Sequence, residues 1–342
     1  MSPSLMQSLR FSDLPEDVCR MIFELVPELD QETGRSCALV SRKVNGWIEP
    51  ILYRTLIFEL EDTDQLGNLC GVIEDINHGD STKSPDFFAS HVKAIVITND
   101  RQQYATSVLS ILKACHNVEM LALWTAKPSG REWVWPYGRD LRDLRDFITS
   151  PELSPRWISI TSNLFPIDEV RFSHPIFQNA TLVELVWEER GDGDPHNVGW
   201  DTLRYLPRLS HFSVYRSFYM KGCDRWVRET VDLLPSSVRV FIFWLYPTFF
   251  FRDDTSKEFE GVKAIQGGDL DSRAIVAYMG YSLPTLPDLH PNLHPIFRSY
   301  NDVVKDSAGV PVGKDFWTLA EEFIEERHRR REARVSLEYV IL

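Results

Sequence analysis

Apolar residues recur along most of the chain with one short spacing. An apolar residue is followed by a second three positions later and by a third two positions after that. The clearest instances are Val92/Ile95/Ile97, Val118/Leu121/Leu123, Ile167/Val170/Phe172, Leu182/Leu185/Trp187, Leu209/Phe212/Val214 and Val238/Phe241/Phe243, and Thr55/Phe58/Leu60 is a weaker first one. Alternation of this kind is typical of strands, so each instance predicts a short strand with these residues on one face.

The intervals between the predicted strands are long enough for a helix and its turns. Instances begin 26 residues apart at 92 and 118, 27 apart at 182 and 209, and 29 apart at 209 and 238. Helices are predicted at 64–76, 104–115, 139–148, 200–205 and 224–233. The interval from 118 to 167 is too long for one unit. It contains 125–136, which is predicted to be an inserted loop because two prolines and a glycine interrupt it.

The pattern fades after residue 251. Residues 253–268 are polar and are predicted to form a loop, and 272–279 is a candidate last strand. Residues 283–295 contain four prolines and cannot be regular. From 314 a helix is predicted, with Phe316, Leu319, Phe323 and Ile324 on one face. We expect it to pack across the open end of the preceding domain as a cap.

The repeated spacing resembles the strand segment of leucine-rich repeats, in a degenerate form without the usual asparagine after the strand. The resemblance implies an α/β fold: an irregular solenoid of parallel strands backed by helices over residues 58–300, closed by a helical cap at 301–342. A compact α/β domain is the alternative fold.

Residues next to the predicted core-facing positions should point to the other face of the sheet. The spacing puts four of them at equivalent positions: Trp124, Glu188, Tyr215 and Trp244. If this face is open, these residues are candidates for binding a target protein, because Trp and Tyr dominate binding hot spots. If the C-terminal segment folds over the face, they are core. The sequence favours neither alternative.

The first sixty residues predict short helices. Asp13 is a suitable N-cap and Pro15 suits an early helical position. Val18, Met21, Ile22 and Leu25 then form one apolar stripe, before Pro27 ends or bends the helix. A second helix is predicted after Gly34, carrying Cys37, Leu39, Val40, Val44 and Trp47. Two or three short helices bury too little surface to be stable by themselves. We therefore expect this region to pack against a neighbouring domain or a partner chain.

The order of motifs in this region resembles the F-box in the variant found in many fungal proteins. It runs Leu14-Pro15-Glu16, Ala38-Leu39-Val40-Ser41-Arg42 and Pro50-Ile51-Leu52-Tyr53-Arg54, over residues 10–57. The family binds a Skp-type adaptor, which in turn holds a cullin. Carried over by position, the resemblance implies contacts from Leu14, Pro15, Val18, Ile22, Leu39, Val40 and Leu52. The alternative is that these helices form a cap on the larger domain, and that their apolar stripe is only part of the core.

The composition is that of a folded protein of about two domains, with 342 residues, 43% of them apolar and 25% charged. The net charge is −13, and the one strong basic cluster, 327–334, lies beside glutamates, so nucleic acid is not an expected partner. Five scattered cysteines, without a CxxC pair, favour a reducing compartment. Because no apolar run suits a signal peptide or a membrane span, we expect the protein in the cytoplasm or nucleus, without a membrane partner.

The sequence contains none of the common motifs for phosphate binding, hydrolysis or metal-dependent catalysis. We therefore expect no enzymatic activity, no cofactor and no metal. The F-box resemblance implies a substrate-recognition subunit of an SCF-type ubiquitin ligase, which recruits an unknown target through the repeat domain. The alternatives are an interaction scaffold that binds the adaptor outside a cullin complex, and an enzyme with an unrecognised site.

Overall fold

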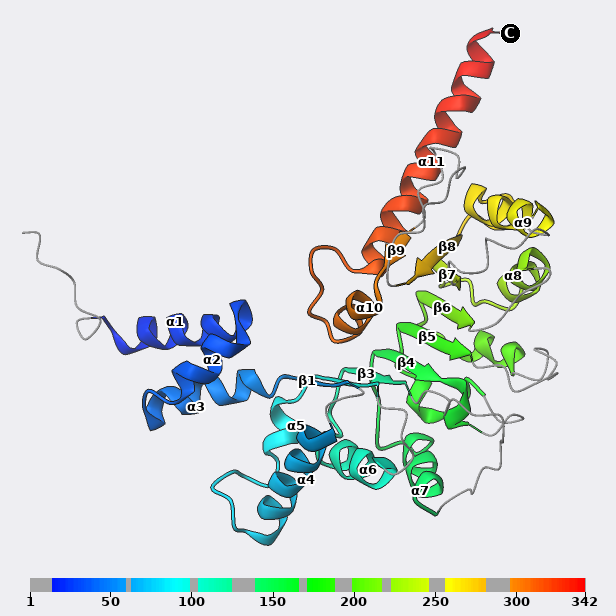
Figure 1. Ribbon diagram of the computed structural model, residues 1–342. Helices are drawn as coiled ribbons and strands as arrows, with labels where there is room; N and C mark the ends of the chain where they lie inside the picture. Colours follow the sequence, from blue (N-terminus) through cyan, green and yellow to red (C-terminus); the bar gives the residue numbers. More distant parts are fainter. Residues whose placement is uncertain are drawn as a thin grey trace, which may run out of the picture.

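The computed structural model describes residues 14–59, 63–98, 104–124, 139–165, 171–187, 199–216, 223–245, 256–280 and 296–341. Within these ranges, parallel strands form a single sheet, and each strand pairs with the next one along the chain. The strands are β1 (Thr55–Phe58), β2 (Ala94–Ile97), β3 (Met120–Leu123), β4 (Trp157–Thr161), β5 (Leu182–Trp187), β6 (His211–Arg216), β7 (Val240–Leu245), β8 (Ala274–Met279) and β9 (Ile296–Arg298). The chain is therefore an α/β protein in which parallel strands follow one another in solenoid order (Figure 1).

Most of the predicted strands are confirmed, as β1, β2, β3, β5, β6, β7 and β8. The spacing missed β4 because Pro155 occupies the position where the pattern requires a first apolar residue. It also missed β9, which spans only three residues. The prediction of a strand ending at Phe172 is wrong, because Phe172 is buried in a turn outside the sheet and residues 167 and 170 lie outside the described residues.

The register of β5 differs from the predicted one by two residues. The ladder pairs Leu185 with Ile160 on one side and with Val214 on the other, so Val183 and Leu185 are the core-facing pair. Leu182 points instead to the other face. Because residues 182–187 are apolar at every position except Glu184, the alternation alone fits both registers. Hydrogen bonding to the neighbouring strands decides between them.

One face of the sheet, the first face, is covered by the helices that connect the strands. They are α4 (Thr63–His78), α5 (Phe87–His91), α6 (Ala105–Ala114), α7 (Arg139–Ile148), α8 (Cys223–Val231), α9 (Ser256–Gly267) and the 3-10 turns η3 (Ser162–Leu164), η4 (Pro175–Phe177) and η6 (Trp200–Tyr205). One buried row on this face is formed by Ile95, Leu121, Ile158, Val183, Phe212 and Phe241. Four of the predicted connecting helices are confirmed as α4, α6, α7 and α8, and the one predicted at 200–205 is the 3-10 turn η6. Helix α5 was not predicted, and the predicted loop at 253–268 is instead mostly α9.

The opposite face, the second face, is covered by the C-terminal helices α10 (Tyr300–Ser307) and α11 (Phe316–Ile341). Figure 1 shows α10 and α11 on the other side of the row of strands from α8 and α9. The C-terminal helix is thus confirmed, but the expectation that it caps the end of the solenoid is wrong. It crosses the sheet itself, because Phe316, Ala320 and Ile324 bury their side chains against the strands.

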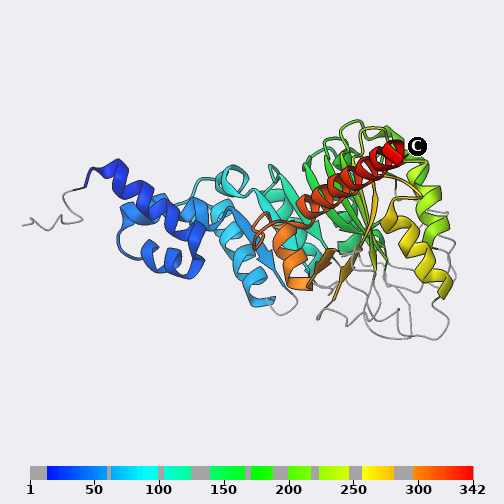
Figure 2. The same cartoon turned by 90° about the horizontal axis from the view of Figure 1, so that it is seen from above.

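Three N-terminal helices precede the sheet: α1 (Glu16–Leu29), α2 (Gln31–Ala38) and α3 (Arg42–Leu52). Pro27 lies inside α1, which continues through it to Leu29, so the helix does not end at Pro27, the first of the two predicted alternatives. The helices pack on one another and extend from the β1 end of the sheet (Figure 2). We call α1–α3 the helical unit.

Candidate docking surface

The helical unit is held together by caps and by one close approach. Asp30 accepts a hydrogen bond from the Thr33 backbone at the start of α2, and Ser41 accepts one from the Val44 backbone at the start of α3. Gly34 is buried against α1, where a Cβ atom would lie 2.6 Å from the Cβ of Pro27. No larger residue fits there without moving the helices, so glycine sets the packing distance.

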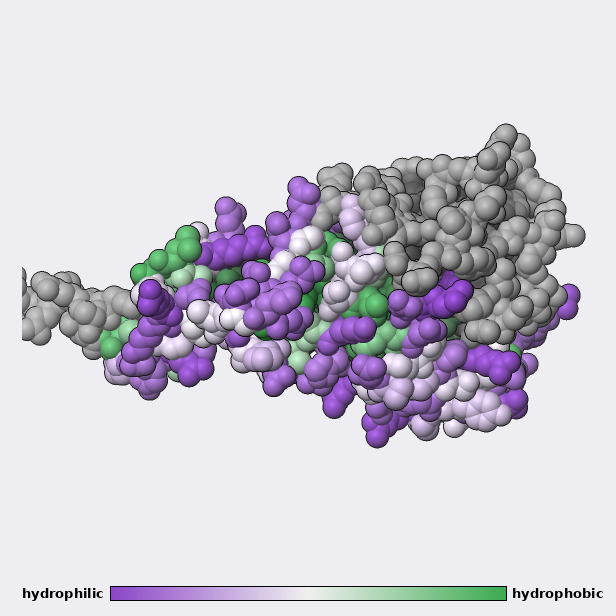
Figure 3. Space-filling view, turned by 90° about the horizontal axis from the view of Figure 1, so that it is seen from below, coloured by the Kyte–Doolittle hydropathy of each residue, from purple (hydrophilic) through white to green (hydrophobic). Residues whose placement is uncertain are grey.

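The helical unit and the turn before α3 expose seven large apolar side chains. On α1, Val18, Met21, Ile22, Leu25 and Leu29 are between 36% and 77% exposed, and in the turn before α3, Leu39 and Val40 are 87% and 65% exposed. We call these seven residues the apolar set. Among the described residues, the other exposed large apolar side chains are Tyr205, Val310 and Val312. Figure 3 shows hydrophobic side chains at the surface of the N-terminal helices. Exposed apolar side chains gathered in this way typically mark an interaction site.

The residues predicted to contact an adaptor lie mostly on this surface. Pro15, Val18, Ile22, Leu39 and Val40 are exposed, and Leu14 is half-buried. Leu52 is half-buried and faces the interior of the unit, where its Cδ2 would be 3.3 Å from a Cβ at Gly34. The alternative, that the stripe of α1 serves only as core, does not fit this exposure.

Three further residues of the apolar set were not among the predicted contacts. Met21 and Leu25 belong to the apolar stripe of the sequence, so helical spacing by itself identifies them. Leu29 follows Pro27, where the helix was expected to end or bend, so the predicted stripe stopped before it. Proline within a helix removes one hydrogen bond but does not always end the helix.

The other side of the helical unit is fixed to the sheet domain. Ile48 of α3 is fully buried, and the Tyr53 ring packs edge-on against Phe87 and Phe88 at 5.5 and 5.4 Å between centroids. Lys83 forms an ion pair with Glu49 and lies 4.8 Å above the Phe87 ring. The unit is therefore anchored through α3, while α1 keeps its apolar stripe in solvent.

The residues predicted to bind a target are not a row on an open surface. Trp124 and Tyr215 are 8% exposed and Trp244 is 1% exposed, because α10 and α11 cover the second face. Tyr215 and Trp244 do pair across β6 and β7, as predicted. Glu188 lies outside the described residues, and the register of β5 gives the position beside Tyr215 to Val186. The prediction of an exposed aromatic row is wrong, and the alternative of a covered face is confirmed.

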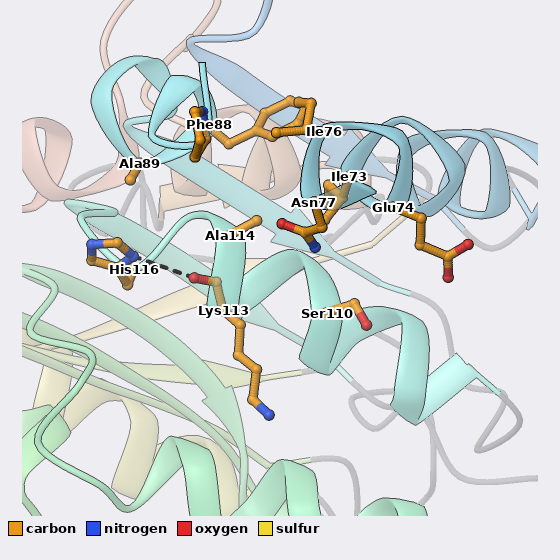
Figure 4. Close-up of a pocket in the computed structure, with 11 residues that line it drawn as sticks. Ile73, Glu74, Ile76, Asn77, Phe88, Ala89, Ser110, Lys113, Ala114 and His116 are labelled. Atoms are coloured by element: carbon orange, nitrogen blue, oxygen red, sulfur yellow. Dashed lines mark hydrogen bonds between the residues drawn. The ribbon is translucent and has the colours of Figure 1, made fainter. Parts of the chain in front are cut away.

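A hollow with a volume of about 280 Å³ lies between α4, α5 and α6 (Figure 4). Ile73, Ile76 and Phe88 line it, and Lys113 and His116 lie at its rim. The His116 ring hydrogen-bonds the Lys113 carbonyl at 3.2 Å. No nucleophile in the hollow is paired with a base, so its side chains do not form a catalytic arrangement.

The described part of the chain holds no group of three or more His, Cys, Asp or Glu side chains arranged to bind a metal ion. Among the described helices, none is both long and apolar enough to cross a membrane. The sequence matches no protein-family model and no curated protein.

Proposed function

We propose that the chain is a substrate-recognition subunit of an SCF-type ubiquitin ligase. The helical unit docks on a Skp-type adaptor, which connects it to a cullin, and the sheet domain recruits a target protein. The observation that carries the proposal is the exposed apolar set on a unit whose opposite side is anchored by Tyr53 and Glu49. The protein supplies binding and no chemistry in this function.

The energetics favour a partner on this surface. Burying one Leu, Ile, Val or Met side chain is worth roughly 1.5–3 kcal/mol relative to leaving it in water. Covering seven such side chains with a partner would therefore release a large free energy that the helical unit does not gain by itself. The fit to a Skp-type adaptor rests on the resemblance of the Leu14-Pro15 start, the Leu39-Val40 turn and the Leu52-Tyr53 end to the F-box.

The test compares two matched pairs of substitutions in the full chain. Leu39→Ser plus Val40→Ser removes two exposed apolar residues from the helical unit, and Val310→Ser plus Val312→Ser removes two exposed valines elsewhere. Each variant is incubated with purified Skp-type adaptor, and binding is measured by calorimetry. We expect the first pair to lose binding, because truncated anchors commonly cost about 2 kcal/mol or more each. We expect the second pair to bind as the unmodified chain does.

Equal binding by both pairs would reject the proposal. A second measurement uses cells: the tagged chain is purified and probed for adaptor and cullin together. Recovery of the adaptor without any cullin would identify the alternative function, an interaction scaffold acting outside a cullin complex.

A further inference from the structure

The second face of the sheet is covered by a segment that we call the strap: α10, the turn that follows it, and α11 as far as Arg327. Phe316 of the strap packs against Trp244 at 5.2 Å and against Trp157 at 6.1 Å between ring centroids. Tyr300 packs against Trp124 at 5.8 Å. The strap thus closes an aromatic layer over the strands.

A row of polar residues runs through this aromatic layer. Ser159, Glu184 and Ser213 are aligned across β4, β5 and β6, and all three are buried. The indole Nε1 of Trp124 donates to the Ser159 Oγ at 2.6 Å, and that hydroxyl donates to the Glu184 Oε2 at 2.6 Å. Glu184 is 2% exposed, and among the described residues no ion pair between Glu184 and a cation is seen.

The strap brings a second carboxyl, Asp306 of α10, to the same layer. Asp306 is buried, accepts a hydrogen bond from the Phe316 backbone at 3.1 Å and forms an ion pair with Arg298 at 3.0 Å. Its negative charge acts on Glu184 across the layer. Charging Glu184 therefore places a second anion in a dry layer where the nearby guanidinium of Arg298 already pairs with Asp306.

The protonation of both carboxyls reflects this environment. Burial raises the pKa of Glu184 to about 7; the Ser159 hydrogen bond opposes the rise, and the charge of Asp306 adds to it. Burial likewise raises the pKa of Asp306 to about 6, against the effect of Arg298. Both groups therefore lose a proton from the docked state within the pH range of ordinary cells.

The other charged groups of the layer act differently. His211 of β6 hydrogen-bonds Glu321 of α11 at 3.0 Å, and Glu321 also pairs with Arg239 at 3.0 Å. Burial lowers the pKa of His211, although Glu321 and Asp315 raise it. The imidazole therefore gains its proton only in acid, so it cannot produce a change that appears as the pH rises past neutrality.

We propose that the strap is a proton-controlled cover of the second face, which docks when the Glu184 carboxyl is protonated and loosens when that carboxyl is charged. A carboxyl with a raised pKa stabilises docking fully below its ordinary value of 4.5. This stabilisation is lost as the pH rises through about 7. Asp306 changes in the same direction, through about 6. Loosening uncovers Trp124, Tyr215 and Trp244 together.

The far end of the strap has an anchor that does not titrate in this range. Arg327 donates hydrogen bonds to the carbonyls of Ile265, Gln266 and Ala274, at the end of α9 and the start of β8. Burial lowers the pKa of Arg327 to about 10, so the guanidinium stays charged near neutral pH. We therefore expect α10 and the first turns of α11 to open while the chain at Arg327 stays attached.

The test is amide hydrogen exchange of the full chain from pH 5 to pH 8, corrected for the intrinsic pH dependence of exchange. Amides of 300–307 and 316–324 report on the strap, and those of α6 serve as the reference. In the unmodified chain we expect strap protection to fall by roughly ten- to a hundredfold between pH 5 and 7, because one proton changes the opening constant by at most tenfold per pH unit. Protection of α6 should stay constant.

Three variants identify the group responsible. Glu184→Gln keeps the shape and the acceptor for Ser159, so it should remove the loss of protection through about pH 7 and leave only the smaller change that Asp306 causes through about pH 6. Ser159→Ala removes the hydrogen bond that favours the charged carboxyl, so it should move the loss of protection to higher pH. Ser213→Ala, on the other side of Glu184, removes a hydroxyl without a hydrogen bond among the described residues and should leave the midpoint in place.

Two outcomes would overturn the proposal. One is a Glu184→Gln chain whose strap still loses protection through about pH 7, as the unmodified chain does. The other is a parallel loss of protection in α6, because the carboxyl would then act on the whole fold. If Glu184→Gln does not fold, the proposal is tested by comparing Ser159→Ala with Ser213→Ala. Loss of strap protection at the same midpoint pH in the two variants would reject the proposal.

Discussion

Helices α1 and α11 both carry apolar residues at helical spacing, yet the stripe of α1 faces solvent and that of α11 lies against the sheet. Along α1, Met21 and Leu25 are more than half exposed. Along α11, Phe316 and Ala320 are fully buried under the second face. An apolar stripe therefore predicts that a helix has a face to bury. It does not say whether this chain or another one covers that face.

The anchors of the two helices explain the difference. The helical unit meets the sheet domain through α3 and Tyr53, which leaves α1 on the outside. The start of α11 is held on both sides, by the aromatic contacts of Phe316 and by the hydrogen bonds of Arg327. We therefore expect substitutions in the α11 stripe to reduce stability, and substitutions in the α1 stripe to reduce binding.

The largest effect is expected at Phe316. Phe316→Ala removes a fully buried ring that packs against Trp157 and Trp244, and it should lower the free energy of unfolding by about 3–5 kcal/mol. The midpoint of urea unfolding measures the loss. Val312→Ala, at a 68% exposed position, is the control and should change stability by less than about 0.5 kcal/mol. Similar midpoints for both variants would mean that the strap does not contribute to the fold.

The opposite behaviour is expected for α1. Met21→Ala plus Leu25→Ala should leave the unfolding midpoint nearly unchanged, because both side chains are already in solvent. Affinity for a Skp-type adaptor should fall by about 2 kcal/mol or more for each residue. Calorimetry measures the affinity, and the unfolding curve serves as the control. A large loss of stability would show that the α1 stripe is covered within the chain.

A smaller effect is expected at the helix crossing. Gly34→Ala places a methyl group 2.6 Å from Pro27 and should destabilise the helical unit by about 1–3 kcal/mol. Gly46→Ala is the matched control, because nothing lies within 4 Å of its Cβ position in α3. Alanine there should stabilise the helix by up to about 1 kcal/mol. Resistance of the helical unit to limited proteolysis should fall in Gly34→Ala and rise in Gly46→Ala. If it changed in the same direction in both variants, the close packing of Gly34 against Pro27 would be contradicted.

The smallest effect is expected at the start of α10. Ser299 and Asp302 form a reciprocal capping box there, with both backbone hydrogen bonds at 3.1 Å. Ser299→Ala should cost about 1 kcal/mol of stability, measured by urea unfolding. Ser336→Ala, on the exposed side of α11, should change stability by less than about 0.5 kcal/mol. An unchanged midpoint for Ser299→Ala would mean that α10 is held by its packing alone.

The sequence by itself determined the local elements of this protein. Apolar spacing identified most of the strands and the connecting helices α4, α6, α7 and α8, but not α5 or α9. It could do so because alternation and helical periodicity are local properties of a chain. It also identified the stripe of α1 and most of its exposed residues. In β5, Glu184 interrupts a run that is otherwise apolar. A lone acid in such a run indicates a buried carboxyl in a central strand, but the apolar spacing did not identify it.

Only the tertiary structure decided the register of β5 and the fate of the second face. Two registers of β5 satisfy the same alternation, and pairing with β4 and β6 selects one of them. Trp124, Tyr215 and Trp244 are core rather than surface because α10 and α11, which begin at residues 300 and 316, return to cover them. Such contacts depend on the free energy of bringing distant segments together, which no short window of sequence contains.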